Sequence, residues 1–176
     1  MKTKQRIATF LAAVVVGLSG VVAFAPPAHA ATWGPFLVQN ASTGLCLDSY
    51  SSDLVVRMRT CDAELSYQQW KFVDTGSPFQ YWILDFTPSC MTPYGLNTGD
   101  GVIQTGCDTG SNYQKWTTSY AGTDSIGPYY FIHSDWSNLY LAHPGWVTPL
   151  AGAGVRTICS DFYACNGWPA WRLWPL

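Results

Sequence analysis

The sequence predicts an all-β domain made of three copies of one structural unit. An aromatic residue, two variable residues and a tryptophan recur as Tyr67–Trp70, Tyr113–Trp116 and Trp168–Trp171. Self-similarity at a period of about 20 to 50 residues is typical of a chain built by repetition of one unit. The segments between these motifs are short and apolar or alternating, with Gly, Pro, Asn, Asp and Ser at their ends, which favours strands over helices.

Each unit is expected to contain four strands, about twelve in all. The expected first strands are rich in aromatic residues: Trp33–Val38, Phe79–Leu84 and Tyr129–Ile132. The expected second strands carry Cys or Leu: Leu45–Leu47, Cys90–Met91 and Leu139–Leu141. A Gly- or Ser-rich loop, a third strand and the tryptophan-bearing strand complete each unit.

The units are drawn roughly as residues 33–78, 79–126 and 127–176. No low-complexity linker separates them. Each unit has apolar strands that must be buried against its neighbours, so the three are expected to share one core and form a single domain.

The N-terminus has the pattern of a secretory signal peptide. Three of the first six residues are basic, Phe10–Phe24 is largely apolar, and Ala28–Ala30 is a small-x-small cleavage site. A membrane anchor is the alternative, but the apolar run is shorter than the roughly 20 residues that span a bilayer. Residues 1–30 are therefore predicted to be removed, leaving a secreted domain of residues 31–176 with no membrane span.

Charge and composition exclude several classes of function. The chain has 11 acidic and nine basic residues, and three of the basic residues lie in the predicted signal peptide. A phosphate-tracking nucleic-acid binder needs clustered Lys and Arg, so that class is not expected. His133 and His143 remain after cleavage, neither in a catalytic context, and there is no phosphate-binding loop or zinc helix motif. No enzyme activity, cofactor or metal is expected.

All six cysteines follow the predicted signal peptide, which indicates disulfides formed in an oxidising compartment. A metal site is the alternative, but no Cys-x-x-Cys pair occurs and His is scarce. Spacing alone leaves the connectivity open. Pairing within units would give Cys46–Cys61, Cys90–Cys107 and Cys159–Cys165.

The repeated motifs resemble those of the ricin B-chain, or R-type, family of β-trefoil lectins and carbohydrate-binding modules. The matching segments are Thr43–Asp48, Val56–Cys61 and Gln68–Trp70, which recur as Cys90–Met91, Cys107 and Gln114–Trp116 and more weakly in the third unit. The resemblance covers essentially the whole chain after residue 30, and it implies a β-trefoil fold and carbohydrate binding. Because Trp is a large apolar side chain, Trp70, Trp116 and Trp171 are expected in the core rather than in contact with a ligand.

The resemblance also implies a sugar site in the first unit. The family has a carboxylate two residues after the first cysteine of a unit, and Asp48 matches that place. Sugar sites combine such an acceptor with a flat aromatic ring. Asp48 is expected to accept hydrogen bonds from sugar hydroxyls and Tyr50 to stack on the sugar ring, with Tyr67 and Gln68 completing the site.

Other positions depart from the family pattern. Thr92 and Ala142 replace the carboxylate in the second and third units, and Arg57 and Arg59 stand where the family has a polar residue and an aromatic. The arginines, two apart on a strand, share a face. We expect a solvated surface there, with binding of an acidic sugar as the alternative.

Tyr67 also admits a second interpretation. Together with Tyr113 and Trp168 it could form a structural ring around the threefold axis rather than a ligand contact.

The function predicted from sequence is therefore a secreted, non-catalytic domain that binds a poly- or oligosaccharide. The alternative is a β-trefoil scaffold that has lost sugar binding and contacts a secreted protein partner, as a protease inhibitor or a toxin partner subunit would.

Overall fold

The computed structural model of the protein describes residues 30–50, 53–143, 156–158 and 169–176. These residues contain twelve strands and two short 3₁₀ turns, η1 (Ser66–Gln68) and η2 (Asn112–Gln114). The first four strands are β1 (Thr32–Asn40), β2 (Leu45–Asp48), β3 (Arg57–Thr60) and β4 (Trp70–Asp74). The next four are β5 (Gln80–Leu84), β6 (Ser89–Pro93), β7 (Asp100–Gly106) and β8 (Lys115–Thr123). The last four are β9 (Pro128–Ser134), β10 (Tyr140–Ala142), β11 (Arg156–Ile158) and β12 (Ala170–Pro175).

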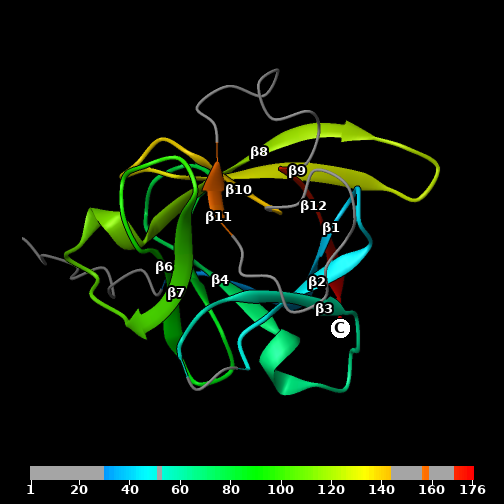
Figure 1. The fold of residues 1–176 in the computed structure, drawn as a ribbon, viewed down its shortest axis with the longest axis horizontal. Coiled ribbons are helices and arrows are strands. Elements are labelled where there is room, and N and C mark those ends of the chain that lie inside the picture. The colour runs from blue at the N-terminus through cyan, green and yellow to red at the C-terminus, as the bar shows by residue number, and fades with distance from the viewer. Residues whose placement is uncertain (1–29, 51–52, 144–155, 159–168) are drawn as a thin grey trace, which may run out of the picture.

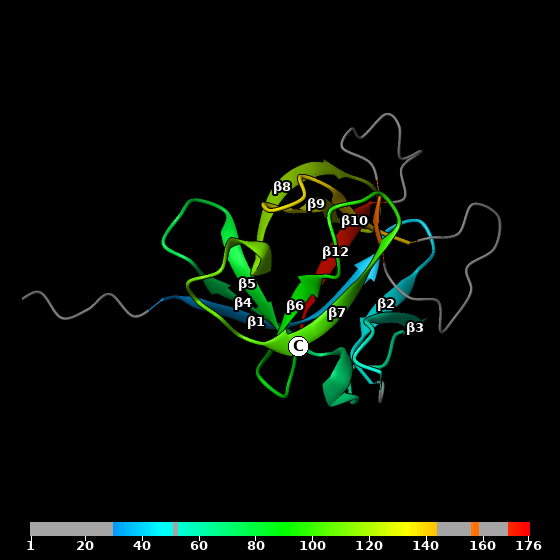
Figure 2. The same ribbon diagram turned by 60° about the vertical axis from the view of Figure 1, so that its left-hand side comes forward.

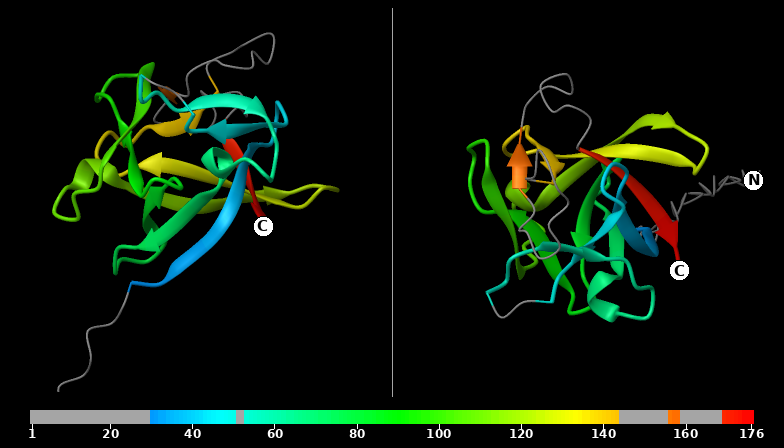
Figure 3. Two further views of the ribbon diagram at one scale, coloured as in Figure 1. Left: turned by 90° about the horizontal axis from the view of Figure 1, so that it is seen from below. Right: turned by 45° about the vertical axis from the view of Figure 1, so that its right-hand side comes forward.

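Six strands form a closed antiparallel barrel. The pairs run β1–β4, β4–β5, β5–β8, β8–β9, β9–β12 and back from β12 to β1. Figure 2 shows β1, β4 and β5 side by side, and Figure 3 shows β1 (blue) beside β12 (red). Closure removes the exposed sheet edges that would otherwise pair with other chains.

The other six strands form three hairpins, β2–β3, β6–β7 and β10–β11. Figure 1 shows them arranged around a common centre. Their apolar residues share one core with those of the barrel: Leu47, Met58, Met91, Val102 and Leu141 pack with Val38, Phe72, Ile83 and Ile132. The predicted all-β fold of three four-stranded units is confirmed.

The three repeated tryptophans hold the hairpins to the barrel. Trp70, Trp116 and Trp171 are completely buried, as expected. Their indole N–H groups donate to the carbonyl oxygens of Leu47, Met91 and Leu141 at 3.1, 2.8 and 2.9 Å. Each unit therefore uses the same side chain both to fill the core and to fix its second strand.

The first strand begins with a close approach of two backbones. Gly34 has φ +105°, and a Cβ there would lie 2.8 Å from the carbonyl oxygen of Trp70. Only glycine fits both the positive φ and the missing space.

The described residues contain two disulfides, Cys46–Cys61 and Cys90–Cys107. They join the pairs that the unit boundaries suggested, and each links the second strand of its unit to the residue after the third strand. The expected pair Cys159–Cys165 lies outside the described residues.

Replacing Cys90 and Cys107 together by alanine is expected to lower the free energy of unfolding by about 3 kcal/mol, since the bond closes a loop of 17 residues. Urea unfolding of the oxidised protein and the double variant would measure this. An unchanged midpoint would show that the second unit does not depend on its disulfide.

His133 on β9 makes stability depend on pH. It packs edge-on to the Tyr140 ring, and burial lowers the pKa of its imidazole below the ordinary value of 6.5, against the opposing effect of Asp135. The unfolded chain therefore binds the proton more readily than the folded chain. The stability that the neutral His133 side chain contributes is fully present above pH 6.5. This contribution is lost as the pH falls from the pKa of the unfolded state toward the lower pKa of the folded state.

A His133→Phe variant is expected to lose less stability than the parent protein between about pH 7 and pH 5. Urea midpoints across that range would test this, with the parent protein as control. Parallel decline of both proteins would contradict the role given to His133.

Candidate functional site

In the first unit, Asp48 lies at the centre of a buried polar cluster. It is the last residue of β2, and its side chain has no exposed surface. One carboxylate oxygen, Oδ1, accepts from the backbone N–H of Tyr50 at 2.9 Å and lies 3.5 Å from the Arg59 Nε. The other, Oδ2, accepts from the Gln68 side-chain amide at 3.1 Å. One carboxylate thus fixes the following turn, the glutamine of the repeated motif and an arginine of β3.

The glutamine occupies the same position in two units. Gln68 donates to Thr60 O at 3.1 Å and accepts from the backbone N–H of Asp62 at 2.9 Å. Gln114 donates to Gly106 O at 2.9 Å and accepts from Asp108 at 2.7 Å. The glutamine therefore holds the chain after each second cysteine, whatever else the unit binds.

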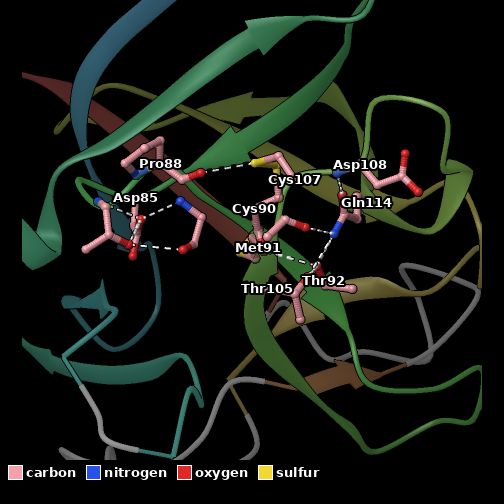
Figure 4. Close-up of a disulfide and its surroundings, with 12 residues drawn as sticks. Asp85, Pro88, Cys90, Met91, Thr92, Thr105, Cys107, Asp108 and Gln114 are labelled. Atoms are coloured by element: carbon pink, nitrogen blue, oxygen red, sulfur yellow. Dashed lines mark hydrogen bonds between the residues drawn. A yellow bond between two sulfur atoms is a disulfide. The ribbon is translucent and has the colours of Figure 1, made fainter.

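The second unit replaces the ionic cluster with hydroxyls. Thr92 stands in the place of Asp48 and Thr105 in that of Arg59, and their hydroxyl oxygens lie 2.9 Å apart. The Gln114 amide donates to both, as Figure 4 shows beside the Cys90–Cys107 disulfide. In the third unit Ala142 takes this place and offers no polar side chain. The first unit alone has a carboxylate at this position.

The arrangement of strands and motifs matches known proteins. A family model described as a ricin-type beta-trefoil lectin domain matches residues 34–126, more than half of the chain. The chain belongs to the ricin-type β-trefoil lectin family. No curated protein sequence matches the chain.

Solved structures similar to this lectin domain share its fold at low sequence identity. A designed threefold-symmetric protein, ThreeFoil, is 20% identical with a TM-score of 0.66, over 80% of this chain and 98% of that one. A Macrolepiota procera ricin B-like lectin solved with lactose is 13% identical with a TM-score of 0.63, over 86% and 100%. SeviL bound to asialo-GM1 saccharide is 15% identical with a TM-score of 0.60, over 83% and 98%.

Asp48 does not lie where direct contact with a sugar was expected. A carboxylate that binds ligand hydroxyls needs an oxygen that the protein leaves unused, but both oxygens of this enclosed carboxylate accept hydrogen bonds within the protein. Arg59 of β3 lies beside this carboxylate, with its Nε 3.5 Å from Asp48 Oδ1. Asp48 therefore organises the first unit of this lectin domain from below its surface.

Arg59 was predicted as part of a solvated face, and the structure gives it a more specific position. Its side chain is about half exposed, and its two terminal amino groups have no partner within the described residues. Strand alternation in the sequence predicted that Arg57 and Arg59 share one face of β3. In the β2–β3 register Arg57 lies opposite Asp48, so this shared face is the one beside Asp48.

Arg57 is engaged elsewhere. Its guanidinium makes two hydrogen bonds to Asp53, one of 2.9 Å and one of 2.5 Å, and this interaction raises the pKa of Arg57. Such an exposed pair contributes little to stability.

The first-unit hollow is a shallow depression of about 380 Å³ above the Asp48 cluster. Its lining includes Arg59, Asp62, Leu65, Tyr67 and Gln68. It therefore combines a guanidinium donor, an exposed carboxylate and a phenol ring. These are the groups that bind sugar hydroxyls and the apolar face of a sugar ring.

Tyr50 and Tyr67 pack against each other beside the first-unit hollow. The Tyr50 and Tyr67 rings lie 4.8 Å apart at 37°, and Tyr50 is 63% exposed. The Tyr67 carbonyl accepts from both the backbone N–H and the hydroxyl of Ser49, which ties the two segments together. Of the expected residues, the structure brings Asp48, Tyr50, Tyr67 and Gln68 into one cluster.

Tyr67 and Tyr113, two members of the expected threefold aromatic ring, each pack against another aromatic ring. Tyr67 contacts Tyr50, whereas Tyr113 contacts Trp136 from the β9–β10 turn at 5.7 Å. The third expected member, Trp168, lies outside the described residues. The threefold ring therefore stays a prediction.

The described part of the chain shows no group of three or more His, Cys, Asp or Glu side chains that could hold a metal ion. It also contains no helix long and apolar enough to cross a membrane.

Proposed function

We propose that this domain is exported and binds carbohydrate, without catalysis, in the first-unit hollow. The observation that carries the proposal is the pairing of the buried Asp48 with Arg59, beside the packed rings of Tyr67 and the exposed Tyr50. The two disulfides are compatible with an extracellular location. Relatives that share the fold were solved with lactose and with a saccharide, which supports a sugar as the ligand class.

Each residue of the proposed site has one role. Asp48 holds Arg59 and the Tyr50 turn in place, so that neither loses much conformational entropy when the ligand binds. Arg59 donates through its free amino groups to sugar oxygens. Tyr67, supported by Tyr50, stacks on the apolar face of the sugar ring. Gln68 keeps the base of the hollow rigid through its bonds to Asp48 and Thr60.

The test is a glycan-array and insoluble-polysaccharide screen of residues 31–176, with Arg59→Ala beside the parent protein. Loss of a charge-assisted hydrogen bond is expected to weaken binding by about tenfold or more. Arg57→Ala is the matched control, because it removes the same charge from the same strand face but lies outside the hollow. Affinity of this control is expected to stay near that of the parent.

Two outcomes would overturn the proposal. A folded parent protein that binds no glycan would direct attention to a protein partner. Equal binding by Arg59→Ala and the parent would move the site out of the first-unit hollow.

A further inference from the structure

A second hollow lies on the other side of Tyr50, where the first and second units meet. This inter-unit groove has a volume of about 470 Å³, within the range of small-molecule sites. Its lining includes Tyr50 and Leu54 from the first unit and Asp85, Phe86 and Gln104 from the second. Tyr50, Leu54 and Phe86 are all largely exposed. The groove thus places apolar and aromatic surface around a carboxylate.

Asp85 has one carboxylate oxygen that the protein does not use. Its side chain is only 3% exposed. The first oxygen, Oδ1, accepts from the Thr87 N–H at 2.9 Å, the Thr87 hydroxyl at 2.8 Å and the Ser89 N–H at 3.0 Å, and Figure 4 shows these bonds converging on Asp85. The second oxygen, Oδ2, is buried without a hydrogen-bond partner in the described residues. A buried acceptor left without a donor is costly and calls for a physical reason.

The turn itself does not need a carboxylate. Asn40 occupies the same place between β1 and β2, and its side-chain oxygen accepts from Ser42 and Thr43 in the same way. Between β9 and β10, the Ser134 hydroxyl accepts from Trp136 and Ser137. A single neutral oxygen is enough in both units. The second oxygen of Asp85 is therefore surplus to the fold.

The walls of the groove are held rigidly to each other. Val56 and Leu54 of the first unit exchange backbone hydrogen bonds with Val102 and Gln104 of β7, at 2.9 and 2.8 Å. The Gln104 side-chain amide also donates to the Ser49 carbonyl at 3.2 Å. A preformed groove loses little entropy when a ligand enters.

We propose that the inter-unit groove is a second saccharide subsite, so that the domain binds an oligosaccharide chain rather than a single sugar. The saccharide chain runs from the first-unit hollow, which Tyr67 lines, across the paired Tyr67 and Tyr50 rings to the groove, which Tyr50 lines. In the groove, a sugar hydroxyl donates to the Asp85 Oδ2 and the sugar ring packs on Phe86 and Tyr50. This inference rests on the proposed function and extends it to the length of the ligand.

The experiment measures affinity as a function of ligand length. Galactose-, xylose- and N-acetylglucosamine-based series, from monosaccharides to hexasaccharides, would be titrated calorimetrically against the parent protein. Asp85→Asn is the main variant, because asparagine keeps the turn acceptor, as Asn40 does, and replaces the surplus acceptor with a donor. Phe86→Ala is a second variant at an exposed position, and Arg59→Ala reports on the first-unit hollow.

The expected result is tighter binding of longer chains by the parent protein. Asp85→Asn and Phe86→Ala should each remove most of this gain, by about tenfold for the longest chain, while binding of the monosaccharide stays unchanged. Arg59→Ala should weaken binding at every length. Affinity that does not rise with length, or a gain that survives in both groove variants, would overturn the second subsite while leaving the first intact. Absence of binding at every length would overturn the proposed function itself.

Discussion

Replacing Trp116 by alanine is expected to lower the free energy of unfolding by about 3 to 5 kcal/mol. Its side chain is completely buried at the centre of the shared core, in contact with residues from the barrel and the hairpins. The substitution leaves a large cavity and also removes the donor to the Met91 carbonyl, which is buried. A loss of this size is a large share of the stability of a small domain.

Urea unfolding followed by far-ultraviolet circular dichroism would measure the effect. Trp136→Ala is the matched control, because Trp136 is 41% exposed and packs on the Tyr113 ring. We expect this control to lose less than about 1 kcal/mol. Comparable losses in the two variants would mean that the repeated tryptophan does not anchor its hairpin.

Replacing Asp48 by alanine is expected to weaken both folding and binding. The Tyr50 N–H loses its acceptor and the Gln68 amide loses one of two acceptors, at a cost of about 1 to 3 kcal/mol. The half-exposed Arg59 can return to water, which keeps the cost below that of breaking a fully buried ion pair. The affinity for sugar should also fall, because the Arg59 side chain and the Tyr50 turn both lose their contact with the Asp48 carboxylate.

The control is Thr92→Ala, the equivalent change in the second unit. Gln114 keeps Thr105 and Gly106 as acceptors, so we expect a loss nearer to 1 kcal/mol and unchanged sugar affinity. Thermal melting and glycan titration of both variants would test the pair. Full sugar affinity in a destabilised Asp48→Ala protein would show that this carboxylate serves the fold alone.

The architecture could be predicted from sequence because each unit repeats the same physical devices. The tryptophans at positions 70, 116 and 171 must be buried somewhere, and a cysteine precedes each of the first two at similar spacing. Local patterns such as these fix strand order and core membership. They extend to the buried glutamines, whose amides serve the same backbone groups in both units.

The sequence could predict which residues belong to the candidate site, but not which of them are exposed to solvent. The spacing after Cys46 brought Asp48 and Tyr50 into the candidate set, and the structure clusters them with Tyr67 and Gln68. The contact between Asp48 and Arg59 joins two strands, and a cross-strand contact depends on pairing register rather than on local sequence. The inter-unit groove was missed for the same reason, because Asp85 and Tyr50 belong to different units.

The three indole hydrogen bonds have a consequence for how such a domain can diversify. Each bond holds the carbonyl of the residue that immediately precedes position 48, 92 or 142. The backbone at these three positions is therefore fixed by the core and does not depend on the side chain it carries. This chain already has Asp, Thr and Ala there on one common scaffold. Ligand chemistry can thus change in one unit while the other two, and the fold, stay as they are.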